Sequence, residues 1–241
     1  MLVKPTGAGR LAGRIALVTG ASRGLGAAVA KCFAAEGAHL VLVARTVGGL
    51  EELDDAVQAL GSSATLVPLD LKEFDQIDRL GAALYERYKK LDILVGNAGM
   101  LGTLTPMGHI DPPVWDEVMA LNVTANWRLI RSMDPLLRQS DAGRAIFVTS
   151  GAGAGVHPYW GAYAASKAAL ESIVRSYAGE MTKTKVRINL IDPGPVRTAM
   201  RAQAFPGEDP LKLRTPDEIA PYFLELALPD CARMGEVVRC Y

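Results

Sequence analysis

The sequence predicts one domain of the α/β class, a doubly wound and about seven-stranded parallel sheet flanked by helices in three layers. Two observations lead to this fold class. Several short runs are almost continuously apolar, which is typical of strands covered on both faces. The longer stretches between them carry apolar residues at i, i+3 and i+4, the spacing of helices that bury one face. Alternation of this kind predicts a parallel sheet with helices on both sides.

The apolar runs predict strands at 14–19, 39–44, 64–68, 92–97, 145–150, 186–192 and 236–239. The helical spacing predicts helices at 24–36, 50–60, 73–89, 113–138, 160–182 and 216–228. Residues 200–213 contain FPGEDP, break the pattern and predict a small irregular insert on the substrate side. No repeat or linker divides the rest, so we expect residues 1–241 to form a single domain.

Composition excludes several classes of function. Of the 241 residues 26 are basic and 26 acidic, so no net charge attracts nucleic acid or an anionic membrane. The three cysteines are scattered without a CxxC pair, which disfavours a disulfide framework or a zinc site. Neither a secretory leader nor an apolar run of about 20 residues occurs, and we expect a cytoplasmic protein without a membrane span.

The stretch RIALVTGASRGLG predicts a strand, a tight turn and a helix that together bind a phosphate. Its glycines, Gly20, Gly24 and Gly26, have the spacing GxxxGxG. Gly20 allows the tight turn, Gly24 leaves room for a pyrophosphate, and Gly26 lets the helix lie close to the sheet. The free N–H groups and positive dipole at the helix start favour the phosphate.

The same letters allow a second interpretation. GASRG matches GxSxG, the nucleophile elbow of hydrolases, in which Ser22 would attack the substrate. That chemistry needs a histidine after a late strand. None of the three histidines, His39, His109 and His157, has that place in the sequence, and this disfavours a hydrolase.

The end of the second strand indicates which dinucleotide binds. An acidic residue about 20 residues past the glycines normally accepts from the free ribose of NAD. Ala44 has that position here, and Arg45 follows it. An arginine suits a 2′-phosphate through its charge and planar donors, and Arg23 in the glycine turn adds a second positive group. We therefore expect NADP(H) to be preferred over NAD(H).

Two further strand ends supply candidates for the same ligand. Asp70, in LDL, is placed to accept a hydrogen bond from an adenine amino group. Asn97, Ala98 and Gly99 follow the fourth strand, and their small size lets the backbone pass beside a cofactor.

A tyrosine four residues before a lysine occurs twice, and the surroundings separate the two pairs. Tyr85 and Lys89 lie among charged residues at the end of a predicted helix, as a solvated turn does. Tyr163 and Lys167 lie among alanines, which leave space for another molecule, and follow a strand that ends in Ser150. The second pair is the candidate reacting centre.

These residue types fit the reduction of a carbonyl by hydride transfer. The oxygen that develops negative charge needs a proton, and tyrosine can supply it although its ordinary pKa is about 10. The ammonium of Lys167 favours the phenolate, brings that pKa toward the working pH, and leaves donors for the ribose of the nicotinamide. Ser150 can donate to the same substrate oxygen.

Asn122 is a fourth candidate. Asparagine is not favoured in the middle of a helix, where MALNVTANW places it. Its amide either holds a water that is linked to the lysine and serves a proton relay, or faces solvent.

In the order and spacing of its motifs, the chain resembles the short-chain dehydrogenase/reductase family over essentially its full length, with a Rossmann-type sheet. The matching segments are TGASRGLG (19–26), LDL (69–71), NAG (97–99), LNV (121–123), TSG (149–151), YAASK (163–167) and DPGPVRT (192–198). More narrowly, the text is similar to uncharacterised bacterial oxidoreductases of this family.

The resemblance implies a catalytic tetrad of Asn122, Ser150, Tyr163 and Lys167, and no metal. It also implies further cofactor contacts, which are Ser22, Leu25, Leu71, Pro193, Gly194, Val196 and Thr198. The family's small or neutral residue before the proline is replaced by Asp192, which is either a surface variation or a change of charge near the nicotinamide. The long helices at 113–138 and 160–182 imply a homodimer or homotetramer.

The sequence indicates the residues that contact the substrate less specifically than those that contact the cofactor. His157, Tyr159, Trp160 and Met200 either line the pocket or pack its loops, and the apolar residues nearby favour a hydrophobic carbonyl or alcohol. The sequence thus predicts an NADP-dependent oxidoreductase. The alternative is a redox sensor or scaffold that binds NADP without turnover, which an intact tetrad disfavours.

Overall fold

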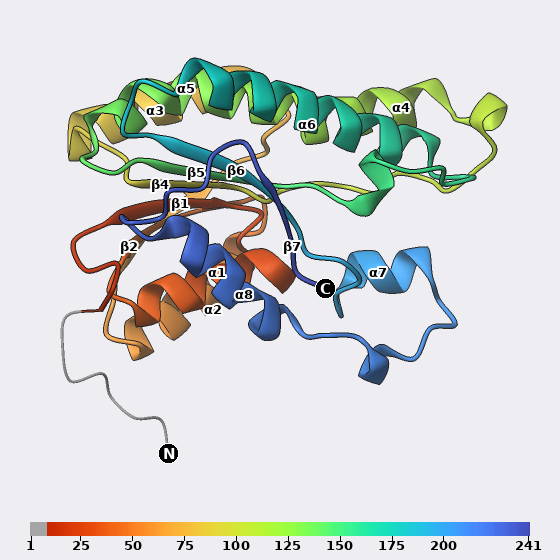
Figure 1. Ribbon diagram of the computed structural model, residues 1–241. Coiled ribbons are helices and arrows are strands. Elements are labelled where there is room, and N and C mark those ends of the chain that lie inside the picture. The colour runs from red at the N-terminus through yellow and green to blue at the C-terminus, as the bar shows by residue number, and fades with distance from the viewer. Residues whose placement is uncertain (1–8) are drawn as a thin grey trace.

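The computed structural model describes residues 9–241, which form a sheet of parallel strands between two helical layers (Figure 1). Each predicted strand is confirmed to within about two residues. The strands are β1 (Ile15–Thr19), β2 (His39–Ala44), β3 (Ala64–Pro68), β4 (Ile93–Gly96), β5 (Arg144–Val148), β6 (Arg187–Asp192) and β7 (Val237–Arg239). They lie side by side in the order β3-β2-β1-β4-β5-β6-β7, and every neighbouring pair is parallel.

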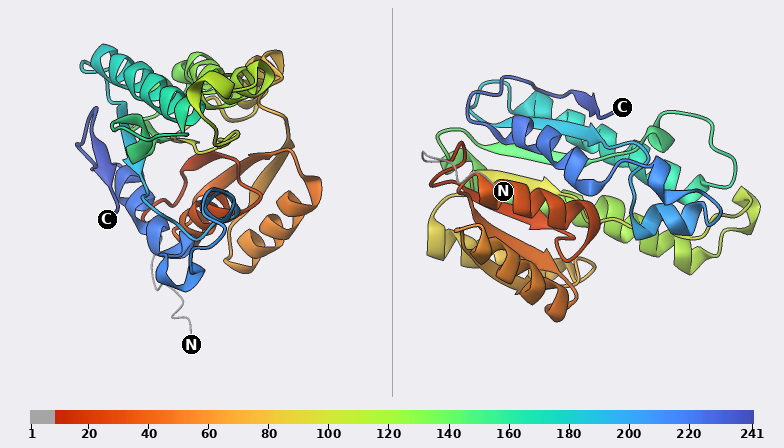
Figure 2. Two further views of the ribbon diagram at one scale, coloured as in Figure 1. Left: turned by 90° about the vertical axis from the view of Figure 1, so that its right-hand side faces the viewer. Right: turned by 90° about the horizontal axis from the view of Figure 1, so that it is seen from below.

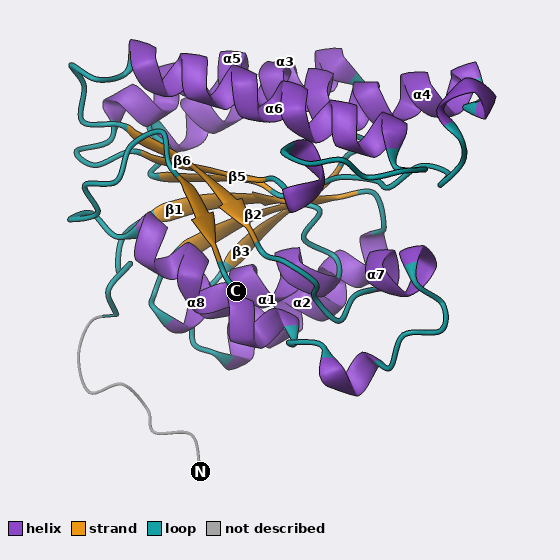
Figure 3. Cartoon of the chain, turned by 45° about the vertical axis from the view of Figure 1, so that its right-hand side comes forward, coloured by secondary structure: helices purple, strands orange, loops and turns teal. Residues whose placement is uncertain are grey.

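The helices cover the sheet on both faces (Figure 3). One layer contains α1 (Gly24–Ala35), α2 (Val47–Ala59) and α8 (Pro216–Ala227), and the other contains α3 (Phe74–Tyr88), α4 (Pro112–Met119), α5 (Ala125–Gln139) and α6 (Gly161–Glu180). The two views of Figure 2 show the same layers from the side and from below. None of the helices in residues 9–241 has the length and apolar character needed to cross a bilayer.

Both faces of the central strands are buried because their apolar side chains alternate between two cores. In β1, Ala16 and Val18 pack toward α1 and α8, whereas Leu17 packs toward the layer of α3, α5 and α6. In β2, Leu42 and Val43 divide between the faces in the same way. This explains why the strands read as continuous apolar runs, since each face needs an apolar residue at every second position.

The prediction of one helix over 113–138 was wrong in detail. The structure has α4, then a π-helical turn, η2 (Ala120–Thr124), and then α5. Asn122 lies in this turn with none of its surface exposed, and its side chain bonds outside its own helix. A wide turn of this kind inserts an extra residue and turns a polar side chain inward, and such turns are frequent at functional sites.

Residues 200–213 are more regular than expected. They include most of a short helix, α7 (Ala199–Ala204), and a 3-10 turn, η4 (Pro210–Lys212). Thr198 caps α7 by accepting from the N–H of Arg201, and Arg201 forms a two-point ion pair with Glu208 at 2.6 Å. This segment lies beyond the sheet at the right of Figure 1, on the side to which the C-terminal residues return.

The strand order reverses between β1 and β4, so the chain leaves these two neighbours toward opposite faces. Thr19, the last residue of β1, joins their ends. Its hydroxyl donates to the carbonyl of Val95 and accepts from the N–H groups of Asn97 and Ala98 at 3.0 and 3.1 Å. Open α/β sheets bind ligands at such a reversal, outside the carboxyl ends of the strands.

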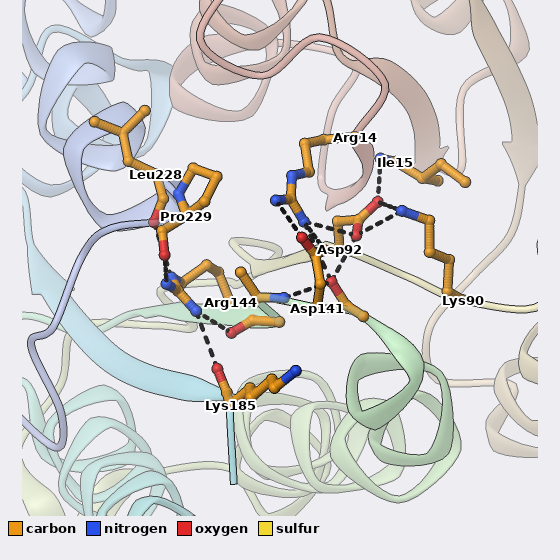
Figure 4. A network of polar contacts seen from close by, with 12 residues as sticks. Arg14, Ile15, Lys90, Asp92, Asp141, Arg144, Lys185, Leu228 and Pro229 are labelled. Atoms are coloured by element: carbon orange, nitrogen blue, oxygen red, sulfur yellow. Dashed lines mark hydrogen bonds and ion pairs between the residues drawn. The ribbon is translucent and has the colours of Figure 1, made fainter.

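At the opposite end of the strands, where β1 and β4 begin, a polar network surrounds Asp92 (Figure 4). Its carboxylate has none of its surface exposed and accepts from the Arg14 and Lys90 side chains at 3.1 and 3.0 Å. The Ser140 hydroxyl and the N–H of Ile15 complete the set at 2.6 and 3.0 Å. These bonds join the starts of β1 and β4 to the turn before β5.

Replacing Asp92 is expected to destabilise the whole fold. In Asp92→Ala the groups around the buried carboxylate lose their acceptor, which costs about 3 kcal/mol of the free energy of unfolding. Urea denaturation followed by circular dichroism measures this loss. Asp141→Asn is the control, because Asp141 pairs with the same arginine at the exposed rim. An equal loss in both variants would contradict the assignment to Asp92.

Candidate functional site

The glycine turn has the geometry that its spacing predicts. Gly20 and Gly24 have φ angles of +63° and +57°, which favour glycine. Gly26 is needed for space, since a Cβ there would lie against the carbonyl of Gly20 and 2.6 Å from Nδ2 of Asn97. Helix α1 begins at Gly24 with no acidic residue in its first turn. Its free N–H groups therefore face the cleft without a competing carboxylate.

A cleft of about 1540 Å³ runs from this turn across the carboxyl ends of the strands. Nearly all the predicted cofactor residues line it. They are Gly20, Ser22, Arg23, Gly24, Leu25, Arg45, Asp70, Leu71, Asn97, Ala98, Gly99, Tyr163, Lys167, Pro193, Gly194, Val196 and Thr198. Gly26 lies behind the wall, consistent with its role in packing the helix. The volume suits an extended ligand together with a second small molecule.

The two arginines lie together at one end of this cleft. The side chain of Arg45 is 68% exposed, and its guanidinium is 3.8 Å from the carboxylate of Asp70, a loose contact that leaves donors free. Arg23 is exposed and lines the same cleft, and its neighbour Ser22 is hydrogen-bonded to Thr46, the residue after Arg45. The other oxygen of Asp70 accepts from the N–H of Lys72 at 2.9 Å. This end therefore offers positive charge and planar donors to an anionic group.

The reacting centre lies at the other end of the cleft, where β5 and α6 meet. Tyr163 and Lys167 are one turn apart on α6, with the Lys167 ammonium 5.6 Å from the centre of the Tyr163 ring. Both are buried, at 8% and 3% exposure. Ser150 follows β5, and its hydroxyl oxygen accepts from the N–H of Ala152 at 3.2 Å. That bond leaves the hydroxyl proton free to donate.

Burial governs the protonation of this centre. It raises the pKa of Tyr163 to about 12, although the Ser150 hydroxyl acts in the opposite direction. It also lowers the pKa of Lys167 to about 8. Both shifts favour the neutral form, as desolvation does. In the protein without a ligand Tyr163 is therefore a protonated donor, and the lowering of its pKa by Lys167 together with the oxidised nicotinamide stays a prediction.

One donor of the Lys167 ammonium goes to the carbonyl of Val148 at 2.8 Å, which fixes the side chain and leaves further donors. Asn122 lies behind the lysine. Its amide nitrogen donates to the carbonyl of Met100 and the hydroxyl of Ser166, and its oxygen accepts from the N–H of Met100, each at 2.9 Å. The side chain thus ties the loop after β4 to α6, and its part in a proton relay stays a prediction.

The substrate candidates divide into two groups. His157, Trp160 and Met200 line the cleft, whereas Tyr159 is not among the lining residues and is 61% exposed. The Trp160 ring contacts the edge of Tyr163 at a centroid distance of 5.9 Å and lies 5.8 Å from the Phe205 ring. The wall beside the reacting centre is therefore largely apolar and aromatic.

Neither the Tyr85–Lys89 pair nor the GASRG motif lies in surroundings that indicate a catalytic centre. Tyr85 is 49% exposed, and Lys89 follows α3 in the left-handed conformation, so this pair belongs to a solvated helix end. Ser22 accepts from the hydroxyl of Thr46, and within residues 9–241 no histidine bonds to it. A serine hydrolase centre is therefore not assembled there.

Comparison with known proteins decides the family. The model of the short chain dehydrogenase family matches residues 14–209. The chain belongs to the short-chain dehydrogenase family. An uncharacterized oxidoreductase, YciK of Escherichia coli K12, is 40% identical over 223 residues, which are 91% of this chain and 88% of that protein. Oxidoreductase UcpA of Salmonella typhimurium is 33% identical over 235 residues, 95% of this chain and 87% of that protein.

Solved short-chain dehydrogenases share the whole fold. A putative short chain dehydrogenase from Escherichia coli CFT073, complexed with NADPH, superimposes with a TM-score of 0.93 at 39% identity. The match covers 97% of this chain and 98% of that one. A second, from Shigella flexneri 2a and complexed with NADP, gives 0.92 at 38% identity over 97% and 99% of the two chains.

Among the residues of this dehydrogenase's cleft that sequence reasoning missed is one at the C-terminal end of the described residues. Tyr241 lines it, and its hydroxyl donates to Oδ2 of Asp192 at 3.0 Å. The two residues are 49 positions apart and come together only because β7 pairs with β6. Asp192 was noted in the sequence because an acidic residue is unusual before this proline, but no local pattern indicates that Tyr241 is its hydrogen-bond partner.

The packing of Gly26 generates a test. Gly26→Ala is expected to lower the free energy of unfolding by at least about 2 kcal/mol, because the added methyl meets backbone that cannot move aside. It should also weaken cofactor binding. Thermal denaturation and a fluorescence titration with NADPH measure the two effects.

Gly179→Ala is the matched control, since a Cβ there meets nothing within 4 Å. Alanine is the better helix former, and this variant should gain about 0.5–1 kcal/mol. If Gly26→Ala were equally tolerated, the close approach of α1 to the turn would be refuted as a requirement.

Proposed function

We propose that this short-chain dehydrogenase transfers a hydride between NADP(H) and a hydrophobic carbonyl or secondary alcohol. Tyr163 is the general acid and base, Lys167 holds the ribose and adds positive charge, and Ser150 stabilises the substrate oxygen. The observation that carries the proposal is the buried phenol beside a free hydroxyl donor and an ammonium, in one cleft with the glycine turn. The chemistry that NADP(H) supplies when bound is hydride transfer.

In the direction of reduction, the chain's own residues manage the charge on the substrate oxygen. Ser150 donates a hydrogen bond to that oxygen, and Tyr163 donates the proton that converts it to an alcohol. The high pKa of Tyr163, about 12 in the unliganded protein, keeps the proton available throughout the neutral range. In oxidation Tyr163 must become the base, and positive charge on Lys167 and on the oxidised nicotinamide favours its phenolate.

The preference for NADP(H) is supported by the exposed arginines. Arg45 and Arg23 line the end of the cleft away from the reacting centre and have donors for a 2′-phosphate. The structures of the relatives from Escherichia coli and Shigella flexneri, solved with NADPH and NADP, support the same assignment.

The apolar wall of the cleft supports the proposal of a hydrophobic substrate. Leu101, Ala152, Trp160 and Met200 cluster around Tyr163. Such a wall favours an apolar or aromatic group next to the reacting carbon and disfavours a strongly charged one. Assembly as a homodimer or homotetramer and a cytoplasmic location stay predictions.

A sensor or scaffold that binds NADP(H) without turnover is the second candidate. It has no use for a buried phenol, a free serine donor and an ammonium at one point. A panel of apolar ketones and alcohols, followed by the absorbance of NADPH, tests the two functions. Turnover supports the dehydrogenase, and binding of NADPH without turnover of any compound supports the sensor.

Removing the phenolic hydroxyl is expected to stop the reaction while cofactor binding persists. Tyr163→Phe should lower kcat by about a thousandfold, the contribution of a general acid, with the Kd of NADPH changed less than about twofold. Steady-state kinetics and a fluorescence titration measure the two. Tyr85→Phe, in the solvated YxxxK pair, should leave both unchanged, and full activity of Tyr163→Phe would refute the proton-donor role.

The choice of dinucleotide is expected to depend on Arg45. The wild-type protein should bind NADPH more tightly than NADH, and Arg45→Ala should weaken NADPH binding by about tenfold through loss of a charge-assisted contact. NADH is the internal control, because it lacks the phosphate and should be affected little. Isothermal titration calorimetry with both cofactors measures this, and tighter binding of NADH to the wild type would overturn it.

A further inference from the structure

The carboxylate of Asp192 is a buried charge in the wall of the cleft. Asp192 ends β6 and is 3% exposed, and it lies among the lining residues at the end that holds Tyr163 and Lys167. Its Oδ1 accepts from the N–H of Gly194 at 3.1 Å, and its Oδ2 from the hydroxyl of Tyr241 at 3.0 Å. Both hydrogen bonds orient the carboxylate, and neither donor carries a positive charge.

No cation in residues 9–241 neutralises this group at close range. Throughout the described range, 9–241, no lysine, arginine or histidine forms an ion pair with Asp192, in contrast to the buried Asp92 with its two cations. Arg239 lies opposite it in the register with β7, but is exposed. Buried carboxylates are normally paired because desolvation of a lone charge is costly. A missing partner in a ligand cleft points to the ligand.

The influence of this charge extends over the reacting centre. Asp192 raises the pKa of Lys167 and Tyr163 on α6, in each case as a smaller effect than burial. It also raises the pKa of Cys240 and Tyr241, which follow β7, again after burial. These are the titratable groups that face it from α6 and the C-terminal segment, and each feels a negative charge.

Tyr241 donates a hydrogen bond to the carboxylate and lines the cleft beside it. A Cβ on Gly194 would lie 2.6 Å from the Tyr241 ring, and one on Gly151 would lie 3.5 Å from Oδ2 of Asp192. Gly194 also has a φ angle of +69°. The absence of side chains at these two positions lets the ring and the carboxylate approach the cleft closely.

We propose that Asp192 is the countercharge for the oxidised nicotinamide and so determines which oxidation state of the cofactor the protein prefers. The proposal rests on the proposed function, since a ring that gives a hydride to a carbon beside Tyr163 must lie at this end of the cleft. The oxidised ring carries one positive charge and the reduced ring none. A fixed carboxylate therefore stabilises the complex with NADP⁺ selectively.

Binding of the two cofactor forms tests this without any substrate. The Kd values of NADP⁺ and NADPH are measured by isothermal titration calorimetry at neutral pH for the wild type and for Asp192→Asn, which keeps the shape and removes the charge. The variant is expected to weaken NADP⁺ relative to NADPH by about fivefold, the effect of one charge across a partly screened gap. High salt should reduce the difference only slightly, because the pair is buried.

Asp70→Asn is the matched control, as the same substitution in the same cleft at the opposite end. It should alter both affinities alike and leave their ratio unchanged. A ratio that stays within about twofold in Asp192→Asn, or one that shifts as much in Asp70→Asn, overturns the proposal.

Two further variants keep the test decisive if Asp192→Asn folds poorly. Asp192→Ser removes the charge with a side chain that still accepts from the N–H of Gly194, and it should shift the ratio equally. Tyr241→Phe keeps the charge and should retain most of the ratio. Lack of turnover on any carbonyl would refute the proposed reaction but leave these ratios measurable, so the two failures are distinguishable.

Discussion

The hydroxyl of Thr19 joins two strand ends from which the chain departs in opposite directions, and the rest of the cleft depends on that junction. It holds the N–H groups of Asn97 and Ala98 against the end of β1. The amide of Asn97 then donates to the carbonyl of Thr19 at 2.8 Å. Because these polar groups satisfy one another, Gly20 is free to turn the chain and Gly26 can bring α1 against it. The phosphate-binding helix start, the loop after β4 and the floor of the cleft thus have fixed positions relative to one another.

At the other end of the cleft, desolvation is the controlling effect. It favours the neutral phenol of Tyr163 and the neutral amine of Lys167, so the unliganded centre disfavours both a phenolate and an ammonium. Asp192 is the fixed negative charge that partly restores the ammonium. Under the proposed function, a positively charged ligand binds and an oxyanion develops among dipoles and a charge that are already oriented, where electrostatic contacts are strong because little water competes.

The sheet could be predicted from the sequence, because a strand that is buried on both faces is apolar at almost every position. The sequence was also sufficient for the glycine turn and the pairing of Tyr163 with Lys167, which are local patterns. The π turn at Asn122 was not predicted, since the hydrogen bond that its side chain makes there is to Met100, 22 positions away. The hydrogen bond between Tyr241 and Asp192 was not predicted for the same reason, because the two residues are 49 positions apart. The high pKa of Tyr163 in the unliganded protein was not predicted, because a list of neighbours does not reveal how completely a side chain is desolvated.

The network around Asp92 lies at the amino ends of the strands, and the candidate reacting centre lies at their carboxyl ends. The bonds that hold the strand starts together therefore share no residue with the groups that meet a ligand, and the two sets can change independently. The segment that carries α7 and the Arg201–Glu208 ion pair contacts Trp160 through Phe205 and contributes no strand to the sheet, so we expect its replacement to alter what binds beside Trp160 without loosening the strands. A scaffold divided in this way lets new substrate ranges arise by exchange of one peripheral segment, while Tyr163, Lys167 and the dinucleotide turn are inherited intact.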